Sequence, residues 1–92
     1  MYYVAYEEKN TKQKRWKVFG NKKEVFEYFK KIMPKQIPDS NELKELDEAI
    51  GDKWSIAKLT ADTRKKLENY FGKKGTELEG KGEYLPDTVA SL

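Results

Sequence analysis

The spacing of the apolar residues changes at Gly20, and this change limits the chain to a fold that mixes strands with helices. Before Gly20, apolar and aromatic side chains recur at every second position, as in a β-strand that buries one face. After Asn21 they recur at intervals of three and four residues, as in a helix with one apolar side. At 92 residues the chain is long enough for one domain and too short for two, so both kinds of element must share one core.

The first part of the chain is expected to form a hairpin followed by a helix. Residues 2–8 and 15–19 alternate with period two and are rich in strand-forming residues, and the polar residues 9–14 have the composition of a turn. Asn21 and the glutamate three residues later have the spacing of a capping box, so a helix should begin there. Pro34 should end this helix.

Two further helices and a third strand are predicted downstream. Apolar residues recur at helical spacing within residues 39–50 and again within 60–71, and a glycine follows each of these segments. Residues 54–59 alternate like a strand, although they could also open a longer helix; we favour the strand. The expected fold class is therefore α+β in the order β-β-α-α-β-α, with a small antiparallel sheet whose helices pack mainly on one face.

The compact α+β domain is expected to comprise residues 1–72. Glycines and a proline are concentrated in residues 73–92, a composition typical of a flexible polar tail. A docked segment around Tyr84 and Leu85 is the alternative for part of this tail.

Composition removes the side chains on which most catalytic and metal sites depend. The chain has no Cys and no His, so it lacks thiolate nucleophiles, zinc–thiolate clusters and the commonest general base. Residues 75–82 nearly match a phosphate-binding loop, but Gly82 stands where that loop needs the Ser or Thr that holds magnesium. The acidic residues within 39–48 lack the spacing of a calcium loop and should form a solvated helix face. We therefore predict that the protein is not an enzyme and binds no cofactor, metal or small-molecule substrate.

The sequence also favours a cytoplasmic protein that does not bind membranes. No stretch is apolar enough for a membrane span or a secretory leader, and the absence of cysteine fits a reducing compartment. Only two of the 19 basic residues are arginine, and such a lysine bias is what an AT-rich coding genome produces, such as that of a low-GC bacterium or its phage.

The predicted hairpin combines aromatic residues with cations. Such a surface is suited to single-stranded nucleic acid, with bases stacked on the rings and phosphates beside the lysines; the competing interpretation is that the aromatics form a buried strand face. The order of strand, basic turn, strand and a helix opened by Asn21-Lys22-Lys23-Glu24-Val25 is similar to the arm-type DNA-binding domains of tyrosine integrases. This resemblance covers residues 2–33 and implies DNA binding through the sheet. We do not assign the chain to that family on this order of elements.

The distribution of charge favours a protein partner over nucleic acid. The net charge is positive over residues 1–35 and 51–75 and negative over 36–50 and 76–92, and the scarcity of arginine weakens sequence-specific DNA readout. We expect a small protein-binding regulator or inhibitor, with a nucleic-acid-binding module as the alternative. The candidate binding residues are hairpin cations and aromatics expected to be exposed: Tyr3, Lys12, Lys14, Arg15, Lys17, Tyr28 and Trp54. The sequence leaves the oligomeric state and the identity of the partner open.

Overall fold

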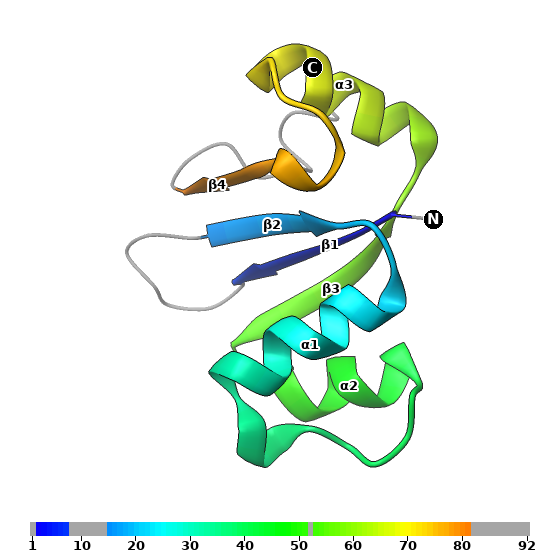
Figure 1. Cartoon of the computed structure of the whole chain (residues 1–92), viewed down its shortest axis with the longest axis vertical. Coiled ribbons are helices and arrows are strands. Elements are labelled where there is room, and N and C mark those ends of the chain that lie inside the picture. Colours follow the sequence, from blue (N-terminus) through cyan, green and yellow to red (C-terminus); the bar gives the residue numbers. More distant parts are fainter. Residues whose placement is uncertain (1, 8–14, 52, 82–92) are drawn as a thin grey trace.

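The computed structural model describes residues 2–7, 15–51 and 53–81 of the chain (Figure 1). In chain order the elements are β1 (Tyr2–Glu7), β2 (Arg15–Phe19), α1 (Lys22–Ile32), the 3-10 helix η1 (Pro34–Gln36), α2 (Leu43–Ile50), β3 (Trp54–Leu59), α3 (Ala61–Phe71), the 3-10 helix η2 (Gly75–Glu77) and β4 (Glu79–Lys81). The predicted α+β class and the order β-β-α-α-β-α are confirmed, including the third strand. A fourth strand, β4, follows the last predicted helix.

The strands form one antiparallel sheet in the order β3-β1-β2-β4. Val4 in the central strand β1 lies opposite Val18 of β2 and opposite Ala57 of β3. At the other edge, Trp16 of β2 lies opposite Gly80 of β4. Because β3 and β4 are the two edge strands, the connection through α3 has to cross the whole width of the sheet.

Helices cover both faces of the sheet. Successive side chains along a strand point to opposite faces, so Ala5 and Phe19 pack toward α1 and α2 while Val4 and Val18 pack toward Leu67 of α3. Figure 1 shows α1 and α2 on one side of the sheet and α3 on the other. The expectation that the helices pack mainly on one face is therefore wrong, because the apolar side of α3 covers the face that the first two helices leave open.

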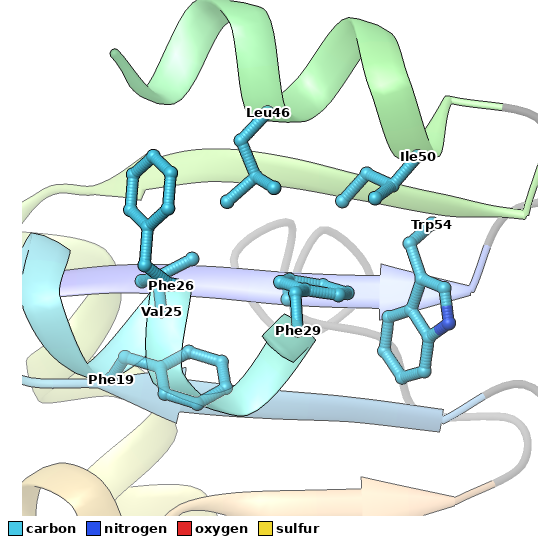
Figure 2. Packing of buried hydrophobic residues seen from close by; sticks show 8 residues of the cluster. Phe19, Val25, Phe26, Phe29, Leu46, Ile50 and Trp54 are labelled. Atoms are coloured by element: carbon cyan, nitrogen blue, oxygen red, sulfur yellow. The ribbon is translucent and has the colours of Figure 1, made fainter. Parts of the chain in front are cut away.

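The larger apolar cluster lies between the sheet and the first two helices. Its buried residues are Ala5, Phe19, Val25, Phe26, Phe29, Leu46, Ile50 and Trp54 (Figure 2). Leu46 and Ile50 point from α2 toward the side chains of α1 (Figure 2). Phe29 and Trp54 meet edge to face with their ring centroids 5.6 Å apart, a geometry that adds about 0.5–1.5 kcal/mol to the effect of burial alone.

The start of α1 follows the predicted capping pattern. The Asn21 side chain accepts a hydrogen bond from the Glu24 amide at 2.9 Å, and the Glu24 carboxylate accepts one from the Gly20 amide at 2.8 Å. These contacts satisfy amide groups that a helix N-terminus would otherwise leave without partners. They also hold the turn that leads from β2 into α1.

The chain beyond residue 72, where the compact domain was expected to end, stays packed against the sheet as far as Lys81. Leu78 is fully buried in the second cluster, and its carbonyl accepts a hydrogen bond from the Val18 amide at 3.0 Å. The physical reason is that one buried leucine and a strand ladder anchor a segment whose composition is otherwise that of a linker. Residues 82–92, with the alternative docking segment around Tyr84, lie outside the described residues.

Candidate functional site

Four of the predicted binding residues line one hollow in the surface. This hollow has a volume of about 390 Å³ and is lined by Arg15, Trp16, Lys17, Tyr28, Trp54, Lys73, Glu79 and Gly80. A second hollow of about 300 Å³ shares Lys17 and Tyr28 with it and is also lined by Val18, Phe19, Glu24, Glu27, Lys31 and Thr76. We call the two hollows together the β2 groove, because they follow β2 between α1 on one side and residues 73–80 on the other.

Aromatic rings form the floor of the β2 groove. The ring centroid of Tyr28 lies 5.2 Å from that of Phe19 and 6.0 Å from that of Trp54. The expected exposure of Trp54 is wrong, since this residue is only 2% exposed and packs on Phe29. Helix α1 covers this face of the sheet, which the spacing of residues along β3 does not reveal. Trp54 therefore lies beneath the groove surface, where its ring packs against those of Tyr28 and Phe29.

Arg15 and Lys17, the two predicted cations in the described residues, are each paired with a carboxylate. Arg15 Nη2 donates to Glu7 Oε1 at 2.8 Å, and Lys17 Nζ lies 3.4 Å from Glu79 Oε2. The Glu7 side chain is 3% exposed whereas that of Arg15 is 49% exposed. The hydrogen bond to Glu7 and the negative charge of Glu7 raise the pKa of Arg15 above its ordinary value. This end of the groove therefore holds a permanent, oriented cation.

Tyr28 places a phenol between the charged groups. It is half-buried, and its pKa is raised, chiefly because burial disfavours the phenolate. The positive charge of Arg15 opposes this shift, while the carboxylates of Glu7 and Glu79 add to it. At neutral pH Tyr28 is therefore an uncharged hydroxyl that can both donate and accept a hydrogen bond.

The other predicted binding residues do not join the groove. Tyr3 is half-buried and lines a separate hollow of about 210 Å³ beside Leu43, Asp47 and Ile56. Lys12 and Lys14 lie outside the described residues.

Sequence reasoning missed one wall of the groove. Lys73, Thr76, Glu79 and Gly80 come from the segment that was expected to be a flexible tail. At Gly80 an added Cβ would lie 2.5 Å from Nε1 of Trp16, so β4 can lie this close to the indole only with glycine there. The lone Leu78, between two glycines, is the feature that could have indicated a docked strand.

The described residues contain neither a cluster of acidic side chains suited to a metal nor a long apolar helix. In these residues no three acidic side chains are grouped so that they could hold a metal ion, and no helix is long and apolar enough to cross a membrane. Comparison of the chain with protein-family models, with curated proteins and with solved structures gives no match.

Proposed function

We propose that this chain is a non-enzymatic binding protein, a small regulator or inhibitor, whose β2 groove takes up a segment of another protein. The observation that carries the proposal is an aromatic floor beneath two cations, Arg15 and Lys17, that are already paired with carboxylates. Aromatic residues and arginine are enriched in protein interfaces. Charged groups on the two sides of such an interface are arranged so that positive groups of one protein face negative groups of the other.

The carboxylates in the groove argue against nucleic acid as its ligand. The groove mixes both signs, because Glu24, Glu27 and Lys31 line the α1 wall while Glu79 and Lys73 line the opposite wall. A run of phosphates along the groove would pass close to these carboxylates, which repel it. A protein segment can instead match each charge with one of opposite sign.

A nucleic-acid-binding role is the second candidate, and a different surface favours it. Three lysines of α1, Lys22, Lys23 and Lys30, line a hollow of about 320 Å³ together with Phe26, Glu27 and Asn41. Grouped ammonium charges suit phosphates. Phe26 is buried, however, and both faces of the sheet are covered, which leaves this surface without the open stacking rings that single-strand binders use.

The test is a pull-down with the tagged full-length chain, with and without nuclease, using three charge reversals. Lys17→Glu changes the groove, Lys22→Glu changes the α1 lysines, and Lys65→Glu on α3 is the matched control. Thr76→Arg adds a bulky side chain to the groove wall without touching an ion pair. Circular dichroism confirms that each variant is folded.

The expected result is a protein that survives nuclease, is lost with Lys17→Glu and Thr76→Arg, and is retained with Lys65→Glu. A partner that both groove variants retain would contradict the proposal. Loss of all bound material after nuclease, together with loss on Lys22→Glu, would favour nucleic-acid binding through α1. That binding should also weaken steeply with salt, by roughly 0.7–0.9 log units per log unit of salt for each phosphate contacted.

A further inference from the structure

Arg15 is held in a fixed position at one end of the β2 groove. Its Nη2 donates at 2.8 Å to Glu7, whose side chain is 3% exposed, and among the described residues Arg15 is the cation that pairs with this buried carboxylate. The guanidinium carbon also lies 5.6 Å from the centre of the Trp54 ring. The two contacts orient the guanidinium before any ligand arrives, so little conformational entropy is lost when a ligand binds.

Arg15 still presents hydrogen-bond donors to the groove. A guanidinium carries a planar fork of N–H groups, and the contact with Glu7 uses only one of its nitrogens. The Arg15 side chain is 49% exposed and lines the larger hollow. A planar acceptor with two oxygens fits this geometry best.

The charges around the larger hollow leave a positive excess. Glu7 offsets Arg15, and Glu79 offsets Lys17. Lys73 also lines the hollow, is exposed, and has no carboxylate partner among the described residues. The adjoining hollow has no such excess, because Lys17 and Lys31 line it together with Glu24 and Glu27.

We propose that Arg15 and Lys73 seat an acidic side chain, Asp or Glu, of the partner protein. This inference rests on the proposed function and names the chemistry of its partner. The volume of about 390 Å³ leaves room for a neighbouring apolar residue over the half-buried Tyr28. The adjoining hollow is lined by Lys17 and Lys31 as well as by Glu24 and Glu27, so it favours neither sign, and the segment that fits is acidic and then apolar.

The direct test titrates short synthetic peptides of this pattern into the isotope-labelled full-length chain. One peptide carries Glu at the acidic position, and a matched peptide carries Gln. Inorganic phosphate and a short oligothymidylate are the other anionic probes. The readouts are the NMR signal of the Arg15 side-chain Nε–H and the dissociation constant.

The expected result is that the Glu peptide shifts the Arg15 signal and binds more tightly than the Gln peptide, phosphate or oligothymidylate. Arg15→Lys keeps a cation beside Glu7 but removes the fork, and should weaken the Glu peptide roughly 10- to 100-fold, as expected for a charge-assisted hydrogen bond. Lys73→Gln should weaken it about two- to fivefold, as expected for an exposed pair. Lys65→Gln on α3 should have no effect.

The variant Glu7→Gln distinguishes two effects of Glu7 on binding: its positioning of the Arg15 guanidinium and its contribution to the net charge of the site. This variant makes the site more positive, so simple attraction would strengthen binding of the Glu peptide. If the Glu7 carboxylate positions Arg15, binding should weaken instead, and the NMR signal of the unbound Arg15 should move.

Equal affinity for the Glu and Gln peptides, an unchanged affinity in Arg15→Lys, or phosphate binding as strong as that of the Glu peptide would each overturn the inference. Failure of the proposed function looks different, because the pulled-down partner would then survive both Lys17→Glu and Thr76→Arg. If those variants release the partner while Arg15→Lys retains it, the groove function stands and the acidic anchor does not.

Discussion

Trp16 and Gly80 show how single residues set the position of the groove wall. The indole packs against Phe71 with the ring centroids 5.3 Å apart, and an added Cβ at Gly80 would lie 2.5 Å from its Nε1. Trp16 Nε1 is buried and has no acceptor among the described residues. Packing against Phe71 and the close approach of Gly80 therefore help to fix the indole, and with it the distance between β2 and β4.

Gly80→Ala should lower the free energy of unfolding by about 1–3 kcal/mol, because the added methyl overpacks the indole. Chemical denaturation measures this loss, and Thr76→Ala on the exposed surface is the control. In a Trp16→Phe background the loss should shrink, since the smaller ring leaves room. An equal loss in both backgrounds would show that the clash with Trp16 is not the cause.

Tyr28 gives the stability of the protein a pH dependence. Burial raises its pKa above the ordinary value of 10.0, so in a window above pH 10 the folded chain keeps a proton that the unfolded chain has lost. The corresponding stabilisation is complete below that window and disappears as the pH rises through the folded pKa. Tyr28→Phe should therefore reduce the alkaline loss of stability, as measured by urea denaturation on both sides of pH 10. Identical pH profiles for the two proteins would contradict this assignment.

At the scale of elements, β4 decides whether the groove has two walls. Its three residues, Glu79–Lys81, pair with β2, and the preceding Leu78 is buried between the sheet and α3. A strand of this length is held mainly by burial of its neighbouring apolar residue and by pairing with a longer strand. Stability and binding should therefore both depend on the segment after α3.

Leu78→Ala should lower the free energy of unfolding by about 2–4 kcal/mol, because it removes a fully buried side chain and leaves a cavity. Ile32→Ala is the control, since Ile32 is 42% exposed and should cost far less. Urea denaturation of the full-length chain measures both. If Leu78→Ala lowers the free energy of unfolding no more than the control does, the segment after α3 is not anchored by Leu78, as the predicted flexible tail would require.

At the scale of the whole molecule, one sheet carries an apolar cluster on each face. The central strands β1 and β2 contribute residues to both clusters: Ala5 and Phe19 to one, Val4 and Val18 to the other. Loss of either cluster would expose side chains of the strands that support the second. The two clusters should therefore unfold together.

Tryptophan fluorescence can test this cooperativity, because the two tryptophans of the chain lie in different clusters. Trp54→Phe leaves Trp16 as the probe of the α3 side, and Trp16→Phe leaves Trp54 as the probe of the α1–α2 side. Within each variant, the fluorescence and far-UV circular dichroism transitions should coincide in urea. A fluorescence transition separate from the loss of secondary structure would indicate that the faces unfold independently.

The sequence alone determined the first three strands and the three α-helices in their order, because these depend on neighbours in the chain, but it did not predict β4. The change of apolar spacing at Gly20, the Asn21 cap and the alternation within residues 54–59 each correspond to an observed element. Arg15, Lys17, Tyr28 and Trp54, which the sequence offers as binding residues, line one hollow, and their binding of a partner stays a prediction. Their residue types, aromatic rings and cations, are the basis of that prediction.

Only the tertiary structure decided which face each element covers. Burial of Trp54 depends on α1, the anchoring of Leu78 depends on a sheet face and α3, and the fixing of Arg15 depends on Glu7 of another strand. The first two contacts join residues far apart in the sequence, the third joins neighbouring strands of the hairpin, and period-two spacing is the same whichever face a helix covers. The groove is built from such long-range contacts, which is why local patterns predicted its residues in part and its shape not at all.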